Sequence, residues 1–271
     1  MAMCKIMSLA LIIILLVSLF APYIAPYSPI EIDMKNRLKS PSMDHLLGTD
    51  SLGRDVFSRL VYGGRTSILL SIIASMLTML LGLVLGIIAG YFGGKLDSII
   101  QMIINIFQAL PSISFMIALI GIMGPGIKSI LISVILTSWA SFSRIVRGEV
   151  LKIREENYIE GAKALGSNNL HIIIHHILPN IMGPFIILFT TRIGKVILSI
   201  AGLSFLGLGL KPPTPDWGVM ISDAKTYYLS NPILLIAPGT CIMILSLSIN
   251  LIGDALRDYL DTRGDAHKQY L

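Results

Sequence analysis

Long apolar stretches and shorter polar segments alternate along the whole chain. A helix that crosses the hydrocarbon layer of a membrane needs about 20 mainly apolar residues, and six stretches approach that length. The most uniform of them is the second. The six stretches are residues 5–24, 66–91, 99–123, 127–142, 181–203 and 233–252. The pattern predicts an all-α, polytopic membrane protein with about six transmembrane helices.

Two of these stretches carry interruptions, and the first needs a separate interpretation. Pro111 lies in the middle of the third stretch and predicts a kink or a break, because proline removes a backbone hydrogen bond inside a helix. Arg192 and Lys195 lie three residues apart in the fifth stretch. The first stretch follows Lys5 and has the pattern of a secretory signal peptide. Prolines surround the small residues within 21–26, where cleavage would fall, so we expect this helix to be retained.

The composition agrees with a membrane location. Hydrophobic residues make up 54% of the chain and charged residues only 14%, whereas a soluble domain carries about 25% charged residues. The net charge is +5, but basic residues are not clustered with stacking aromatics, which argues against nucleic acid as a partner. With the N-terminus inside, ten basic residues would lie in inner segments and nine in outer ones, so charge counting leaves the orientation open.

Missing motifs narrow the range of functions. No G-x-x-x-x-G-K-[S/T] segment is present, so the chain does not cradle ATP phosphates in that way. The spans offer almost no carboxylates, and no nucleophile, metal site or acid pair can be assembled, so we expect no enzyme. An ion-coupled secondary carrier usually needs intramembrane acidic residues and remains a remote alternative. Cys4 and Cys241 are interpreted as isolated thiols.

The most informative polar segment is residues 143–180. Residues 158–165 predict a short helix that ends at Gly166, because glycine readily adopts the left-handed conformation of a helix end. A second short helix is expected from about Asn168 to near Pro179. Two short helices joined by a turn on a membrane surface would form a rigid protrusion that docks in a groove of another protein. The alternative is an ordinary amphipathic connector.

These residues resemble the cytoplasmic coupling motif of ABC importer permeases. In that motif E-A-A is followed after three residues by glycine and, nine residues later, by I-x-L-P. The matching positions are Glu160, Ala162, Gly166, Leu178 and Pro179. Gly161 stands where the motif has alanine, and His176 stands where it has isoleucine. Neither change removes the pattern of helix, stop and helix.

Three further segments extend the resemblance over nearly the whole chain. Residues 47–59, 203–218 and 250–258 are similar to segments of the dipeptide, oligopeptide and nickel permeases. The similarity is to the second, or C, permease of such systems. It implies the type I permease fold of ABC importers.

The resemblance also implies a domain division, a topology and a set of partners. Residues 1–65 would hold the first transmembrane helix and an extracytoplasmic loop. Residues 66–271 would form a core permease domain of five transmembrane helices, with cytoplasmic coupling helices at about residues 150–180. Both termini would be cytoplasmic in a prokaryotic plasma membrane, and residues 204–232 would face outside. The partners would be a second homologous permease, an extracytoplasmic substrate-binding protein and two ATPase subunits. The ATPases would use ATP and Mg, and this chain would bind no cofactor.

Two groups of residues inside the spans are candidates for packing or transport. Gly82, Gly86 and Gly90 recur every four residues and predict close packing against a neighbouring helix, which could belong to the partner permease. Arg192 and Lys195 share a helix face and are candidates for the translocation path of an anionic substrate. They could instead pair with the partner permease or extend to the membrane interface.

The identity of the substrate is indicated only by resemblance. Residues 217–225, followed by Tyr228, look more like the nickel permeases than the peptide permeases. We therefore expect nickel or a chelated transition metal, with a dipeptide or oligopeptide importer as the alternative. His171 and His175 have the i, i+4 spacing of metal ligands. They lie in the coupling segment, away from any pore, and we expect no metal site in this chain.

Overall fold

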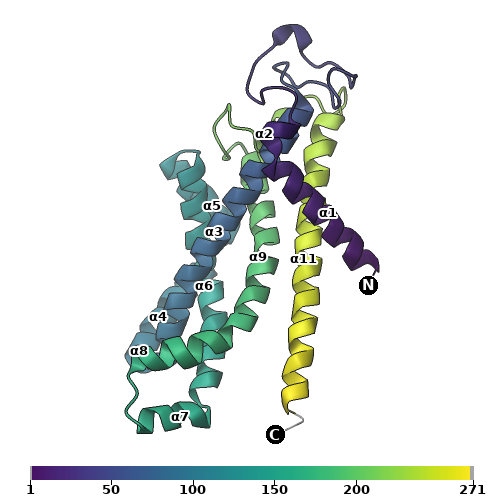
Figure 1. The fold of residues 1–271 in the computed structure, drawn as a ribbon. Helices are drawn as coiled ribbons and strands as arrows, with labels where there is room; N and C mark the ends of the chain where they lie inside the picture. The colour runs from purple at the N-terminus through teal and green to yellow at the C-terminus, as the bar shows by residue number, and fades with distance from the viewer. Residues whose placement is uncertain (1, 269–271) are drawn as a thin grey trace. The chain divides into compact units, whose positions relative to one another are not determined.

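The computed structural model describes the backbone of residues 2–268 and the side chains of residues 6–258. This part of the chain is almost entirely helical (Figure 1), and its one β-type pairing is an isolated antiparallel bridge between Thr49 and Asp55. The helices are α1 (Ala2–Leu19), α2 (Ala21–Ile24), the 3-10 turn η1 (Met34–Asn36), α3 (Val56–Phe92), α4 (Gly94–Ala109), α5 (Ser112–Met123), α6 (Ile127–Arg154), α7 (Asn157–Ala164), α8 (Asn169–Ile172), the π-helical turn η2 (Ile173–Ile177), α9 (Leu178–Phe205), α10 (Trp217–Ala224) and α11 (Ile233–Lys268).

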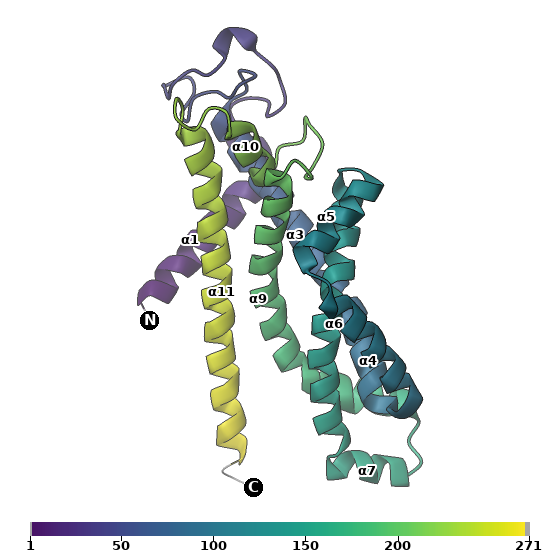
Figure 2. The ribbon, with the colours of Figure 1, turned by 180° about the vertical axis from the view of Figure 1, so that it is seen from behind.

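Four helical segments of the described chain are long and apolar enough to cross a membrane (Figures 1 and 2). They are Val56–Phe92, Ile127–Arg154, Asn169–Phe205 and Ile233–Asp258. These segments coincide with the second, fourth, fifth and sixth predicted stretches. The prediction of an all-α, polytopic membrane protein is therefore confirmed, and the other two stretches take different forms.

The third predicted stretch is broken at Pro111. The axes of α4 and α5 differ by 88° across this break, so the pair is either one broken span or a re-entrant loop. Leu110 is extended, with ψ 132°, as expected for a residue that precedes proline. The first predicted stretch is short: its described apolar helix, Ile6–Leu19, does not reach the length of the four crossing segments.

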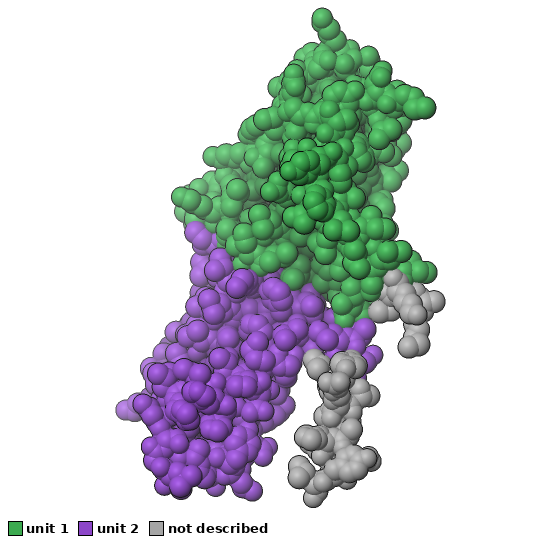
Figure 3. All heavy atoms as spheres, in the orientation of Figure 1, with its two compact units in different colours: residues 1–73, 117–131, 193–252 green, residues 74–116, 132–192, 253–271 purple. Residues whose placement is uncertain are grey.

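The chain forms two compact units (Figure 3). Unit 1 contains residues 1–73, 117–131 and 193–252, and unit 2 contains residues 74–116, 132–192 and 253–271. The long helices α3, α6, α9 and α11 contribute residues to both units. Each unit has its own buried apolar cluster.

Unit 1 packs around Trp217, the first residue of α10. The indole is buried, and its Nε1 donates a hydrogen bond to the carbonyl oxygen of Leu60 in α3 at 2.8 Å. Asp216 caps α10 by accepting from the Val219 N–H at 3.1 Å, and Ser67 Oγ donates to the same carboxylate at 2.5 Å. Burial raises the pKa of Asp216, while the hydrogen bonds act in the opposite direction.

Four charged side chains connect the polar loop before α3 with α10 in unit 1. Arg54 Nε lies 2.7 Å from Asp50 Oδ2, and Arg59 Nε lies 3.4 Å from the same oxygen. The Nη2 atoms of both arginines approach Asp223 Oδ2 at 3.4 and 3.6 Å. Mutual attraction offsets part of the desolvation cost of buried charges, so the cluster holds the loop against α10.

Candidate coupling site

The helix α7 and the turn after it form the first half of the candidate coupling site, in unit 2. α7 ends at Ala164, and Gly166 follows with φ +82°, a conformation that favours glycine. The Gly166 N–H donates to the Lys163 carbonyl at 2.9 Å, and the Ser167 N–H donates to the Ala162 carbonyl at 3.0 Å. This pair of bonds satisfies carbonyls that a helix end leaves without partners.

The second half of the site begins at Asn168, whose side chain caps α8 by accepting from the Leu170 N–H at 3.2 Å. The prediction that this helix ends near Pro179 is wrong. α8 continues through η2 into α9, and Pro179 is the second residue of α9. The Leu178 N–H bonds to the Ile173 carbonyl, five residues back. This wider turn changes the hydrogen-bond register just before Pro179. Pro179 has no backbone N–H to donate, and with the changed register the helix continues through it.

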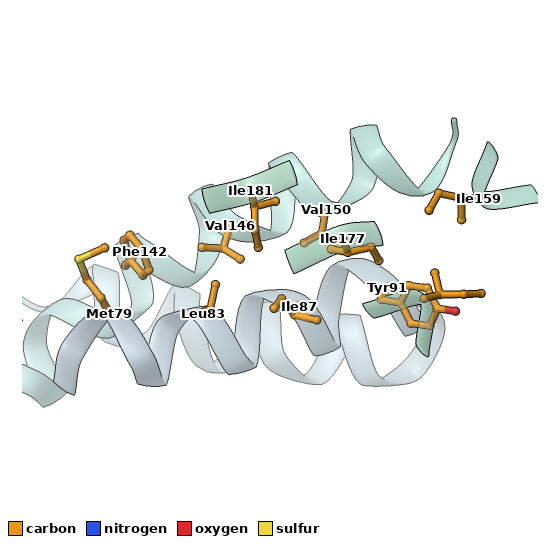
Figure 4. Close-up of a cluster of buried hydrophobic side chains, with 11 residues drawn as sticks. Met79, Leu83, Ile87, Tyr91, Phe142, Val146, Val150, Ile159, Ile177 and Ile181 are labelled. Carbon is orange, nitrogen blue, oxygen red and sulfur yellow. The ribbon is translucent and has the colours of Figure 1, made fainter. Parts of the chain in front are cut away.

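The coupling segment consists of α7, the Gly166 turn, α8 and η2. One of its faces is anchored in a cluster of buried apolar side chains (Figure 4). Ile159 of α7, Ile172 of α8 and Ile177 of η2 have no exposed surface. The cluster consists of Met79, Leu83, Ile87, Tyr91, Phe142, Val146, Val150, Ile159, Ile172, Ile177 and Ile181. Burial of one such side chain contributes about 1.5–3 kcal/mol, so the short helices are firmly attached to α3, α6 and α9.

The opposite face of the same segment is open. Glu160, Gly161 and Pro179 are exposed, whereas Ala162 and Leu178 are partly buried against the cluster. Three large apolar side chains on this polar segment also remain exposed: Leu165 at 88%, Leu170 at 61% and Ile174 at 47%. Covering such side chains with another protein is favourable because it removes apolar surface from water. The segment thus has one face buried against the membrane helices and one exposed face.

The three glycines of α3 lie against α6. A Cβ atom at Gly82, Gly86 or Gly90 would lie 2.7 or 2.8 Å from its nearest atom of α6. The missing side chains let the two backbones approach closely. The helix packed against this glycine stripe therefore belongs to the same chain.

Charged side chains hold the ends of the helices next to the coupling segment. Arg147 of α6 forms a bidentate pair with Asp97 of α4, with N–O distances of 2.6 and 2.5 Å. Arg154, at the end of α6, donates from Nη1 to the carbonyl oxygens of Gly90 and Tyr91 at 3.1 and 3.3 Å. Both carbonyls lie in the last turn of α3, where helical partners are missing.

Tyr91, Arg154 and Asn169 are residues of the site that no sequence motif marks. Tyr91 Oη donates to Asn169 Oδ1 at 2.8 Å, across 78 positions of the sequence. The only local signal is an aromatic residue at the end of an apolar span, which indicates the membrane interface. It does not indicate a contact with the coupling segment.

Arg192 and Lys195, the candidates for a translocation path, differ in burial, and two histidines of the coupling segment lie close together. Arg192 Nε is buried without a hydrogen-bond partner among the described residues, and Lys195 is exposed. The rings of His171 and His175 stack at 4.2 Å between centroids. Among the described residues, no group of three or more histidine, cysteine, aspartate or glutamate side chains could hold a metal ion.

Comparison with known families accounts for most of the chain. Residues 82–264 match the family described as binding-protein-dependent transport system inner membrane component. Residues 6–41 match the N-terminal TM domain of oligopeptide transport permease C. The first match alone covers more than half of the chain and includes the entire coupling site.

Curated relatives cover most of the chain at substantial identity. The dipeptide transport system permease protein DppC of Alkalihalophilus pseudofirmus is 43% identical over 249 residues, which is 92% of this chain and 82% of the relative. The glutathione transport system permease protein GsiD of Shigella flexneri is 40% identical over 257 residues, which is 94% of this chain and 85% of the relative.

Solved structures share the fold at low sequence identity. A chain of the inward-facing MetNI methionine ABC transporter matches with a TM-score of 0.61 and 19% identity, covering 74% of this chain and 96% of that chain. A chain of an amino acid ABC transporter with histidines matches with a TM-score of 0.58 and 13% identity, covering 75% and 94%.

Family, relatives and fold agree with the helical membrane architecture. Permeases of this class are not enzymes, because ATP is hydrolysed by separate ATPase subunits. The chain belongs to the family of binding-protein-dependent transport system inner membrane components and is a multi-pass permease subunit of an ABC importer.

Proposed function

We propose that this chain is the C-type permease of an importer for small peptides, and that it forms half of the translocation path together with a second homologous permease. Two relatives support a peptide cargo, because one is a dipeptide permease and the other a permease for glutathione, itself a tripeptide. They favour the peptide alternative over nickel. The nickel expectation had rested on the appearance of residues 217–225 and Tyr228 alone.

The observation that carries the proposal is the two-faced coupling segment. Its buried face joins the cluster of α3, α6 and α9, while Glu160, Leu165 and Leu170 remain exposed on the chain by itself. An ATPase subunit docked on the exposed face would move α7 when ATP binds and is hydrolysed. Because the buried face is tightly packed, the membrane helices would follow as rigid bodies between inward-open and outward-open states.

The proposal fixes an orientation. The ATPases act from the cytoplasm, so the coupling segment lies there, and we propose the same location for both chain termini. The polar loop of residues 25–55 leads into the first turn of α3, whereas the coupling segment contacts the last turn of the same helix. If α3 crosses the membrane, the loop faces outside, where a substrate-binding protein can reach it.

Leu165→Asp in the complete importer complex tests this assignment. Leu165 is 88% exposed on the chain alone, so aspartate is compatible with folding but places a charge at the proposed ATPase contact. An unpaired charge buried at an interface costs about 2–5 kcal/mol. We expect the ATPase recovered in co-purification, and ATP-driven uptake, to fall at least about tenfold.

Leu229→Asp is the matched control. Leu229 is 82% exposed and lies between α10 and α11, in a segment that would face outside. We expect this variant to retain the ATPase subunits and the uptake of the unmodified complex. Normal ATPase recovery with Leu165→Asp would contradict the docking role of the coupling segment and with it the proposed orientation.

A further inference from the structure

The side chain of Tyr91, in the last turn of α3, contacts both short helices of the coupling segment. Tyr91 is only 6% exposed and shares an apolar cluster with Ile159 of α7 (Figure 4). Ile172 of α8 belongs to the same cluster. The phenol ring therefore lies where α3 and the coupling segment meet.

Polar contacts of Tyr91 reinforce this packing on both sides of the Gly166 turn. On the α8 side, the hydroxyl donates to Asn169 Oδ1 at 2.8 Å. On the α7 side, Lys163 Nζ lies 5.7 Å from the centre of the ring, within the range of a cation–π interaction. One side chain thus connects α3 to each of the two short helices.

The backbone of Tyr91 is itself held in place. Arg154 donates from Nη1 to the carbonyl oxygens of Gly90 and Tyr91, and Gly90 packs directly on Val150 of α6. The end of α3 is consequently tied to α6. A displacement of α7 or α8 that reaches Tyr91 is passed on to both membrane helices.

We propose that Tyr91 is a positioning residue that transmits the movement of the coupling segment to α3. The inference rests on the proposed function, in which ATPase subunits dock on the exposed face of that segment. The ring contacts α7 and the hydroxyl binds α8, so both helices must move together with α3. Without the hydroxyl the ring still packs in the cluster, but the polar link between α3 and α8 is lost.

The test uses the complete complex in proteoliposomes and measures substrate transported per ATP hydrolysed. Tyr91→Phe removes the hydroxyl and keeps the ring, and Asn169→Ala removes its acceptor. We expect each variant to lower the ratio of transport to hydrolysis by about fivefold, the effect of one hydrogen bond. The double variant should be no worse than either single one, because all three lose the same bond.

A purely structural role would lower the yield of assembled complex and leave the ratio of transport to hydrolysis intact. We expect instead an unchanged recovery of the ATPase subunits, an unchanged KM for the substrate-loaded binding protein and a lowered maximal uptake rate. Tyr62→Phe is the matched control, because Tyr62 lies on the same helix and its hydroxyl has no hydrogen-bond partner among the described residues. It should leave the ratio unchanged.

Two results would overturn the inference: a normal ratio for Tyr91→Phe, or losses in the double variant equal to the product of the single losses. Failure of the proposed function looks different. In that case Leu165→Asp would keep its ATPase subunits, which removes the basis for any transmission through Tyr91.

Discussion

At Gly86 the missing side chain provides space, whereas at Gly166 it permits a backbone conformation. A Cβ at Gly86 would lie 2.7 Å from the carbonyl oxygen of Ser143 and 2.7 Å from Val146 Cβ. A Cβ at Gly166 would meet nothing within 4 Å, but φ is +82° there. Glycine is thus favoured at the two positions for different physical reasons, and substitution by alanine separates these reasons.

Gly86→Ala should destabilise unit 2, because the α6 backbone cannot yield as a flexible side chain would. Overpacking of this kind costs about 1–3 kcal/mol. Gly148 of α6 is the control: it is helical, and a Cβ there would meet nothing within 4 Å. Gly148→Ala should be neutral or stabilising by up to about 1 kcal/mol. Thermal unfolding of both variants in detergent is the measurement, and equal midpoints would show that α3 and α6 are not in close contact.

At the scale of elements, two features give the coupling segment its shape: α7 ends before Gly166, and α8 continues into α9. The Gly166 turn reverses the chain between α7 and α8 with two backbone hydrogen bonds. The π-helical turn η2 then carries α8 past Pro179 into the long helix α9. The second short helix is therefore the end of a membrane-crossing segment.

Alanine at Gly166 and at Gly161 should have opposite effects on this element. Neither Cβ would meet an atom within 4 Å, so only the backbone conformation differs. Gly166→Ala forces a left-handed conformation on a residue with a side chain, at a cost of about 1–2 kcal/mol. Gly161→Ala lies within α7 and should gain up to about 1 kcal/mol.

The readouts are the substrate transported per ATP hydrolysed and the midpoint of thermal unfolding of these two variants. We expect both to fall for Gly166→Ala and neither to fall for Gly161→Ala. Indistinguishable variants would contradict the role given to the turn.

At the scale of the whole molecule, the sequence was most informative where a feature is local. Apolar runs predict the crossing helices because length and composition alone decide whether a segment can span a membrane. Pro111 predicts the break between α4 and α5 for the same reason, since its effect acts on the adjacent residue. The turn at Gly166 is likewise a property of a few neighbouring residues.

Features that depend on distant contacts could not be predicted in this way. Pro179 signals a helix stop, and only the π-helical turn before it explains why the helix continues. The bond from Tyr91 to Asn169 joins residues 78 positions apart, and no local pattern indicates it. From the sequence alone, the helix packed against Gly82, Gly86 and Gly90 could belong to this chain or to the partner permease, and the packing of α6 decides between them. The expectation of nickel came from a few residues between α9 and α11, whereas the named relatives favour a peptide cargo.

The most direct test of the account is uptake by the reconstituted complex, with the second permease, the ATPase subunits and the substrate-binding protein present. Vesicles supplied with ATP should accumulate a labelled dipeptide or glutathione. Excess unlabelled peptide should compete, and nickel ions should not. Uptake should cease without ATP whatever ion gradient is imposed. Accumulation of radioactive nickel without peptide uptake would contradict the peptide cargo, and peptide uptake that persists without ATP would contradict the role of the chain as an ATP-driven permease.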